Sequence, residues 1–260
     1  MKYGFIGCGN MGSAILRALC QNTKDIMISD RSGRARAIAE ELGVVYGDNR
    51  RIAEQCERIF IGVKPHMVAD CLTELKGILA DRKPLLISMA AGVELSRLEE
   101  LVGDLPLLRI MPNTPTAIGR GVIPYCATEK ARPYLADWLS DMAPCGLLDA
   151  LDESLMDAAG ALSGSGPAYC YILMEALADG AVACGLPRQK AMQYAAATLE
   201  GAAGMLLHSS AHPGALKDAV CAPGGSTIAA LRVLEQRGFR SAAMDCIVAA
   251  WEKNKQLGKF

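Results

Sequence analysis

The stretch Lys2-Tyr3-Gly4-Phe5-Ile6-Gly7-Cys8-Gly9-Asn10-Met11-Gly12 decides the fold of this chain. A short apolar run enters the pattern Gly-x-Gly-x-x-Gly, and a helical pattern with Ile15, Leu16 and Leu19 follows directly. In such a unit the first glycine permits the tight turn, the second lets a pyrophosphate approach the backbone, and the third lets helix and strand pack closely. Because a second apolar strand is expected at residues 25–29, the pattern favours a dinucleotide site over a structural turn.

The second strand ends at Asp30-Arg31-Ser32, where the adenosine ribose of a bound dinucleotide would lie. An acidic side chain there usually accepts the ribose hydroxyls of NAD, whereas Arg31, Ser32 and Arg34 can bind the additional phosphate of NADP. The same residues can also be solvated surface groups. We predict that the cofactor is NADPH, with NADH as the tolerated alternative.

Strands and helices continue to alternate after this point. Helices are expected at residues 34–42, 50–56, 65–79 and 129–142. Strands are expected at residues 44–46, 58–63, 84–89, 107–111, 121–126 and 145–148. Strands that alternate with helices predict a parallel sheet covered by helices, which is an α/β fold.

Three loops fall at the carboxyl ends of these strands, the edge where such sheets bind ligands. They are Val63-Lys64-Pro65, Ala90-Ala91-Gly92 and Pro112-Asn113-Thr114-Pro115. Lys64 can be an exposed loop lysine as easily as a ligand. Asn113 and Thr114 are stiffly placed between two prolines, and a ligand role and turn chemistry are equally supported for them.

The composition changes after Ala150. From residue 152 onward the chain is rich in Ala, Leu and Gly, is helical in period and contains no convincing strand. We therefore predict a dinucleotide-binding domain at residues 1–150 and an all-helical domain at residues 151–260. The helices expected at 166–184 and 188–207 are apolar nearly all round, and so small a domain has too little else to cover them. This predicts an obligate homodimer with interlocked helices.

The overall composition excludes several classes of partner. The 260-residue chain is 51% hydrophobic and 21% charged, has a formal net charge of -1 and contains no run of like charges. Neither a nucleic-acid partner nor a membrane surface is expected, and no apolar stretch reaches the roughly 18–20 residues that span a bilayer. We predict a cytoplasmic protein that binds small molecules.

The ten cysteines and three histidines suggest no metal site. Cys20, Cys170, Cys184 and Cys246 have mostly apolar neighbours and no Cys-x-x-Cys pair occurs, so we interpret the cysteines as reduced core residues. No cluster has the spacing of metal ligands. His212 stands before Pro-Gly and predicts a turn between helices, not a catalytic group.

The stretch Ala222-Pro223-Gly224-Gly225-Ser226-Thr227-Ile228 opens directly into an apolar helical pattern. Glycines let the backbone approach a ligand, and the first-turn N–H groups of a helix have no intrahelical partner. Ser226 and Thr227 add two hydroxyls beside them. An anionic group would bind well at this helix start, although a capped tight turn has the same residue types.

One missing residue narrows the chemistry. A nucleotide-binding domain followed by a helical domain suits hydride transfer, and hydroxy-acid dehydrogenases of this build carry Gly-x-Gly-x-x-x-Lys, whose lysine is the general base on the alcohol. The corresponding run here is Gly164-Ser165-Gly166-Pro167-Ala168-Tyr169-Cys170, which lacks the lysine. A cyclic imine needs no such base, because water can protonate its nitrogen. The site then only has to hold a carboxylate and orient the ring.

Seven motifs follow one another from end to end of the chain. They are Phe5-Ile6-Gly7-x-Gly9-x-Met11, Val63-Lys64-Pro65-His66, Ala90-Ala91-Gly92-Val93, Met111-Pro112-Asn113-Thr114-Pro115, Leu162-Ser163-Gly164-Ser165-Gly166-Pro167-Ala168-Tyr169, His212-Pro213-Gly214-x-Leu216-Lys217-Asp218 and Pro223-Gly224-Gly225-Ser226-Thr227-Ile228. Together they resemble the pyrroline-5-carboxylate reductase family. The resemblance implies NAD(P)H-dependent reduction of 1-pyrroline-5-carboxylate to L-proline, the last step of proline biosynthesis. It also implies an N-terminal Rossmann domain and a C-terminal helical dimerisation domain, often with a pentamer of dimers.

The resemblance also implies the roles of individual residues. On the cofactor side, the implied set is Gly7, Gly9, Asn10, Met11 and Gly12 at the pyrophosphate, Asn49 and Lys64 toward the adenosine, Ala90, Ala91 and Gly92 at the nicotinamide, and Val63, Pro65 and Asn113 nearby. On the substrate side, the implied set is Gly224, Gly225, Ser226, Thr227 and Asn113, with the Thr227 hydroxyl toward the ring nitrogen as the catalytic group. The family commonly has serine before Pro-Gly-Gly. This chain has Ala222, so one hydroxyl donor to the carboxylate is absent.

Two other functions stay open. One is a related imine or keto-acid reductase, which ring-size analogues would separate. The other is a catalytically inactive dinucleotide-sensing protein, which a turnover assay would separate. The intact Gly-Gly-Ser-Thr helix start argues against the inactive protein.

Overall fold

The computed structural model describes residues 1–31 and 33–257, so the predicted cofactor residue Ser32 lies outside the described residues. The chain divides into two compact units. The first is Met1–Pro167 with the segment from Ala249 onward, and the second is Ala168–Val248. The predicted domains 1–150 and 151–260 divide the chain by composition rather than by compactness, and they stay a prediction.

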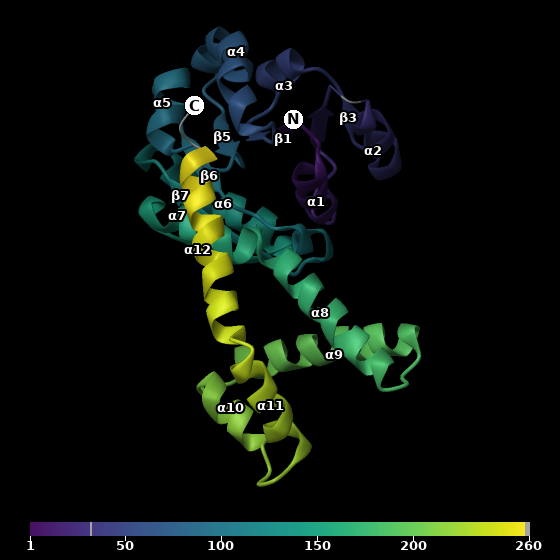
Figure 1. Ribbon diagram of the computed structural model, residues 1–260. Coiled ribbons are helices and arrows are strands. Elements are labelled where there is room, and N and C mark those ends of the chain that lie inside the picture. The colour runs from purple at the N-terminus through teal and green to yellow at the C-terminus, as the bar shows by residue number, and fades with distance from the viewer. Residues whose placement is uncertain (32, 258–260) are drawn as a thin grey trace. The chain divides into compact units, whose positions relative to one another are not determined.

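An eight-stranded sheet forms the centre of the first unit, in the order β3-β2-β1-β4-β5-β6-β7-β8 (Figure 1). Its strands are β1 (Tyr3–Ile6), β2 (Ile26–Ser29), β3 (Val45–Tyr46), β4 (Arg58–Ile61), β5 (Leu85–Ser88), β6 (Leu107–Ile110), β7 (Gly121–Ala127) and β8 (Gly146–Ala150). Strands β2 and β3 lie on one side of β1, and β4 to β8 lie on the other. The strand order therefore reverses between β1 and β4, and the crevice at the carboxyl ends of these two strands is where such sheets bind ligands.

The strand pair β6 and β7 is antiparallel, whereas the other neighbouring strands pair in parallel. The prediction of a parallel sheet is confirmed for those other pairs and wrong for this one. Only residues 111–120 join β6 to β7, and a parallel pair needs a crossover of about a dozen residues or more. The loop that contains Asn113 is this short connection.

Helices cover both faces of the sheet, so β1, β2, β4, β5 and β6 are buried along their whole length, whereas the edge strands β3 and β8 are not. One face packs against α1 (Asn10–Leu19), α2 (Arg34–Leu42) and α6 (Arg132–Met142). The other face packs against α3 (Asn49–Gln55), α4 (Val68–Arg82), α5 (Leu95–Val102) and α7 (Met156–Ala159). Because close-packed layers resist deformation, the loops at the carboxyl edge start from fixed positions.

Short helical turns connect these elements. The 3-10 turns are Pro65–Met67, Thr114–Ile118, Glu129–Ala131, Ala143–Cys145 and Glu153–Leu155, and a π-helix spans Gly160–Gly164. Helix α2 has the predicted bounds. Helix α5 was not predicted, although its buried residues Leu95, Leu98 and Val102 recur at helical spacing.

The second unit is built from helices (Figure 1). The helices in or entering it are α8 (Gly166–Ala183), α9 (Arg188–Leu207), α10 (Pro213–Ala219), α11 (Ser226–Gln236) and α12 (Phe239–Leu257). Its buried core consists of Ala178, Ala191 and Ala195, while Ile172 is 71% and Leu207 83% exposed. A core this small cannot stabilise the unit alone, and its exposed large apolar side chains favour the predicted homodimer.

The cysteines differ between the two units. All ten are free thiols, and those of the first unit, including Cys20, are buried. The prediction that Cys170 and Cys184 are core residues is wrong for the single chain, because both are exposed, and Cys246 is only half-buried.

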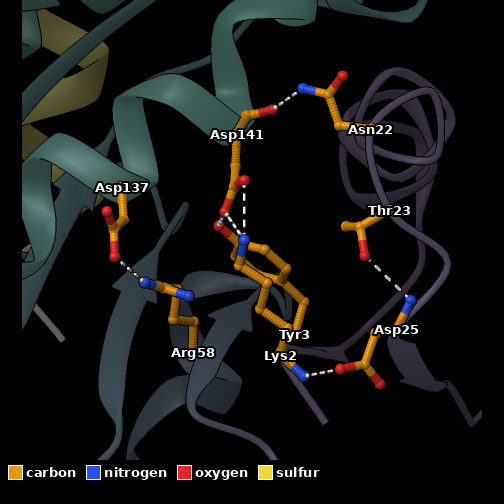
Figure 2. Close-up of polar contacts among 8 residues, drawn as sticks. All are labelled: Lys2, Tyr3, Asn22, Thr23, Asp25, Arg58, Asp137 and Asp141. Atoms are coloured by element: carbon orange, nitrogen blue, oxygen red, sulfur yellow. Dashed lines mark hydrogen bonds and ion pairs between the residues drawn. The ribbon is translucent and has the colours of Figure 1, made fainter.

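A polar cluster holds the amino ends of β1 and β4 to α6 (Figure 2). The Tyr3 hydroxyl donates to Asp141 Oδ2 at 2.6 Å, and Lys2 Nζ donates to Asp141 Oδ1 at 2.9 Å. Arg58 lies against the Tyr3 ring and pairs with Asp137 at 3.4 Å. Burial alone would raise the pKa of Asp141, but the hydrogen bonds from Lys2 and Tyr3 outweigh it and hold that pKa below its usual value. This cluster lies opposite the ligand-binding edge and therefore stabilises the fold.

Candidate active site

A cleft of about 610 Å³ opens at the carboxyl ends of β1 and β4. Its volume lies within the range of about 300–1,000 Å³ that is typical of small-molecule sites. The predicted cofactor residues that line it are Gly7, Gly9, Asn10, Met11, Gly12, Arg31, Asn49, Val63, Lys64, Pro65, Ala90 and Ala91. Gly92 and Asn113 do not line it. The structure thus brings together residues from loops that are far apart in the sequence.

The glycine loop contains glycines that packing requires and one that packing does not. Gly7 has a φ of +94°, and a Cβ at Gly12 would lie 2.6 Å from the Gly7 carbonyl oxygen. A Cβ at Gly62 would lie 2.5 Å from the same oxygen. At Gly9, by contrast, a Cβ would meet no atom within 4 Å. The glycine at position 9 is explained by a ligand that approaches its backbone, so the loop fits a dinucleotide pyrophosphate.

The end of β2 is bonded to the glycine loop. The N–H group of Cys8 donates to Asp30 Oδ2 at 3.0 Å, and the Ser29 hydroxyl donates to Asn49 Oδ1. Burial, followed by the charge of Asp30, raises the pKa of the Cys8 thiol to about 12, so this thiol is not a nucleophile. Asp30 therefore lines the cleft and also holds the glycine loop, through the hydrogen bond that its Oδ2 accepts from Cys8.

Three exposed cations, Arg31, Arg34 and Lys64, line the cleft. Arg31 also lines an adjoining pocket of about 420 Å³, which Asp30 and Asn49 share. A guanidinium binds phosphate oxygens bidentately, so this end of the cleft suits a ribose phosphate.

The loop Ala90-Ala91-Gly92 joins β5 to α5 at the same edge of the sheet. The N–H group of Ala90 donates to Ser88 Oγ at 3.3 Å, and the N–H group of Val93 donates to the Ala90 carbonyl at 3.3 Å. Gly92 is buried and has a φ of +76°. Gly92 thus shapes the turn, whereas Ala90 and Ala91 face the cleft.

Asn113 is buried, and its amide group is used within the protein. Its Oδ1 accepts from the Val122 N–H at 2.9 Å, and its Nδ2 donates to the Ser163 carbonyl at 3.0 Å. Ser163 belongs to the π-helix Gly160–Gly164, a form that is frequent at functional sites. The contacts of Asn113 therefore support a role in holding the π-helix to β7.

The Pro-Gly-Gly turn lies in the second unit. Gly224 has a φ of +70°, the Gly225 N–H donates to the Ala222 carbonyl at 3.0 Å, and Ser226 begins α11. A pocket of about 520 Å³ is lined by Lys217, Gly224, Gly225, Ile228, Ala229, Leu231, Arg232 and Glu235. Ser226 and Thr227 do not line this pocket. The predicted hydroxyls thus lie elsewhere on the first turn of α11, where the backbone N–H groups are free of intrahelical bonds.

The described residues 1–31 and 33–257 show no candidate metal site, and two of the histidines have structural contacts. These residues contain no group of three or more His, Cys, Asp or Glu side chains that could hold a metal ion. His212 caps α10, since its Nδ1 accepts from the Gly214 N–H at 3.0 Å, and His208 Nδ1 lies 2.8 Å from the Gly204 carbonyl. Over the same residues, no helix is both long and apolar enough to cross a membrane.

Known proteins with similar sequences cover the whole chain. Residues 153–257 match the family model described as pyrroline-5-carboxylate reductase dimerisation, and residues 2–92 match NADP oxidoreductase coenzyme F420-dependent. The chain is 36% identical to the pyrroline-5-carboxylate reductase of Escherichia coli, over 99% of this chain and 98% of that protein. The chain belongs to the pyrroline-5-carboxylate reductase family. The protein of the same name from Pisum sativum is 38% identical over 98% of this chain and 95% of that protein.

Solved structures of the family have the same fold. The 1-pyrroline-5-carboxylate reductase from Streptococcus pyogenes has a TM-score of 0.91 at 35% identity, covering 98% of both chains. The Plasmodium falciparum pyrroline carboxylate reductase, solved with NADP bound, has a TM-score of 0.88 at 32% identity, covering 100% of this chain and 98% of that one. The predicted fold class, a Rossmann domain followed by a helical dimerisation domain, is confirmed.

Sequence reasoning missed several residues that line the cleft, namely Gly62, Met67, Asp70, Cys71 and Met89. Gly62 had a signal, because it directly follows a strand and directly precedes Val63 in the predicted loop. Asp70 and Cys71 are on α4, and no sequence pattern singles them out.

Proposed function

We propose that this chain reduces 1-pyrroline-5-carboxylate to L-proline by hydride transfer from NAD(P)H, as the last step of proline biosynthesis. The observation that carries the proposal is similarity to named reductases over nearly the full length of both chains, in a protein whose dinucleotide cleft is intact. The nicotinamide cofactor supplies the hydride when it is bound. NADPH is the proposed cofactor and NADH the alternative.

The cofactor roles follow the lining of the cleft. The glycine loop with Asn10 and Met11 would hold the pyrophosphate at the start of α1, and Gly9 leaves the space for it. Arg31 and Asn49 would hold the adenosine end. The predicted Ser32 belongs to the same end by its place in the sequence. Val63, Lys64 and Pro65 would flank the middle, and Ala90 and Ala91 the nicotinamide, with Gly92 shaping their loop.

The substrate roles fall on the first turn of α11. The free backbone N–H groups of Ser226 and Thr227, beside Gly224 and Gly225, would hold the substrate carboxylate, and the Thr227 hydroxyl would orient the ring nitrogen. Ala222 supplies no hydroxyl, so the backbone carries more of the carboxylate than in relatives with serine there. Asn113 would act on substrate and cofactor indirectly, by holding the π-helix that precedes α8.

The assembly is a homodimer, which the matched dimerisation model and the exposed apolar side chains of the second unit support. We extend this to a pentamer of dimers in the cytoplasm, on the resemblance to the family. Light scattering tests the assembly, because the dimer and the decamer have two and ten times the 27.5 kDa mass of the chain.

A steady-state assay with purified full-length protein tests the function. The oxidation of NADPH should depend on 1-pyrroline-5-carboxylate and should yield proline, and the same assay with NADH gives the cofactor preference. Six-membered imines and keto acids of similar size serve as comparison substrates. Faster turnover of any of these would assign a related reductase, and no turnover of any substrate would assign a dinucleotide sensor.

A further inference from the structure

Glu153 joins two parts of the first unit outside the cofactor cleft. Its Oε1 accepts from the Leu95 backbone N–H at 2.8 Å and from Arg109 Nη1 at 3.0 Å. Leu95 is the first residue of α5, and only Val93 and Glu94 separate it from the loop Ala90-Ala91-Gly92. The N-cap residue of α5, Glu94, makes no side-chain hydrogen bond to the first-turn N–H groups of the helix. Glu153 therefore caps α5 in its place.

Arg109 fixes the place of the Glu153 carboxylate. The Arg109 side chain comes from β6, is only 2% exposed, and donates through Nη2 to Asp157 Oδ1 at 3.0 Å. The carboxylates of Glu153 and Asp157 offset the cost of burying the Arg109 charge. The Arg109 Nε is buried without a partner among the described residues, so the guanidinium depends on these two contacts. A buried guanidinium held between two carboxylates has one orientation, because its donors form a planar fork. Glu153 is thus anchored to the central sheet.

We propose that Glu153 is a positioning residue for hydride transfer, through its hold on the far end of the loop Ala90-Ala91-Gly92. The inference rests on the proposed function, in which Ala90 and Ala91 flank the nicotinamide. The near end of the loop is held by Ser88, whose hydroxyl accepts from the Ala90 N–H. With a side-chain acceptor near each end, the loop Ala90-Ala91-Gly92 is held in a fixed position at the edge of the cleft. Such support matters because a reacting group must be held to within about 0.5 Å.

Two variants of the full-length enzyme separate positioning from charge. Glu153→Gln keeps an oxygen that can accept from the Leu95 N–H, whereas Glu153→Ala removes it. We expect Glu153→Ala to lower kcat about 10- to 100-fold, as a misplacement of roughly 1 Å would, while the dissociation constant of NADPH changes less than about threefold. The isotope effect with NADPH deuterated at the transferred position should rise, because hydride transfer becomes slower. Glu153→Gln should keep kcat within about threefold of the wild type.

Asp141→Asn is the matched control. It removes a carboxylate of the polar cluster at the amino ends of the strands, so it lowers the melting temperature without touching the cleft. The inference is overturned if Glu153→Ala lowers the melting temperature but leaves kcat at the wild-type value, as Asp141→Asn should. It is also overturned if Glu153→Gln loses as much kcat as Glu153→Ala.

If Glu153→Ala does not fold, the triple variant Glu153→Ala/Arg109→Met/Asp157→Asn also removes the remaining ion pair between Arg109 and Asp157, so that no single buried charge is left, and it gives the same comparison. A wild-type enzyme that turns over no substrate would refute the proposed function together with this inference. Normal wild-type turnover with an unchanged kcat in the alanine variants would refute the inference alone.

Discussion

Two glycines of the same loop should differ in how their folding stability responds to one added methyl group. Gly9 lies at the N-cap of α1 with φ -66° and ψ -166°, a conformation open to alanine, and its Cβ would meet no atom within 4 Å. Gly12 lies one turn along, where a Cβ would approach the Gly7 carbonyl oxygen to 2.6 Å. Gly9→Ala should therefore impair cofactor binding but not folding, and Gly12→Ala should impair both.

The magnitudes follow from these contacts. Gly9→Ala reduces the freedom of the unfolded chain, which stabilises by about 0.4–1 kcal/mol, and it exchanges a tolerated N-cap residue for a poor one at a similar cost. Its free energy of unfolding should thus stay within about 0.5 kcal/mol of the wild type. In the cleft the methyl group would block one charge-assisted hydrogen bond to phosphate, worth about 1.5–3 kcal/mol, so the dissociation constant of NADPH should rise about 10- to 100-fold. Gly12→Ala should lose about 1–3 kcal/mol of stability, because the new Cβ would clash with the Gly7 carbonyl and neither the turn at Gly7 nor the first turn of α1 can move freely.

Fluorescence titration with NADPH and thermal unfolding without ligand check both variants. The reasoning is refuted if Gly9→Ala binds NADPH as tightly as the wild type. It is equally refuted if Gly9→Ala loses as much melting temperature as Gly12→Ala, since the empty space at Gly9 would then not explain the glycine.

Asp141→Asn should lower the free energy of unfolding by about 1–3 kcal/mol at pH 7, because two charge-assisted hydrogen bonds are weakened. The pKa of Asp141 is lowered in the folded state, so its contribution is present above the unfolded value of about 3.9 and is lost as the pH falls through the folded value; the difference from the wild type in chemical unfolding should shrink below about pH 4. Replacing Arg31 and Arg34 together with alanine should raise the Michaelis constant of NADPH far more than that of NADH, and equal effects would make them surface charges. Thr227→Ala should lose roughly 10- to 1000-fold in turnover with NADPH binding nearly intact, whereas Thr227→Ser should keep most activity. Loss of cofactor affinity in proportion to turnover would instead make Thr227 a helix cap.

Local patterns predicted most of the fold and one side of the site. The glycine loop was recognised because strand, turn and helix are contiguous in the sequence, so all the information lies within one short stretch. Helix α9 has its predicted bounds, since Pro187 stands directly before its first residue. The loops at the carboxyl edge were found for the same reason, because each one directly follows its strand in the sequence.

Residues whose role depends on distant partners could not be predicted in this way. Arg109 lies in an apolar strand, and its partners Glu153 and Asp157 are 44 and 48 residues away. Asn113 was read as a ligand or a turn residue, whereas its amide contacts Ser163, 50 residues further on. Nothing in the local sequence distinguishes a buried ion pair of this kind from a misplaced surface charge. The exposed Cys170 was misjudged for a related reason, because the apolar run of α8 predicts burial but does not say which residues, if any, of the same chain pack against it.

The cleft has the groups to hold a dinucleotide but offers little acid–base chemistry. Its described lining contains no histidine or tyrosine, and burial raises the pKa of its one thiol, Cys71, away from neutrality. A general acid works best with a pKa near the working pH, and the lysine that serves hydroxy-acid dehydrogenases is replaced by Cys170. An imine that takes its proton from water can be reduced at such a site, whereas an alcohol cannot readily be oxidised there. The pH dependence of kcat should therefore follow protonation of the substrate imine, and it should stay the same in Thr227→Ser.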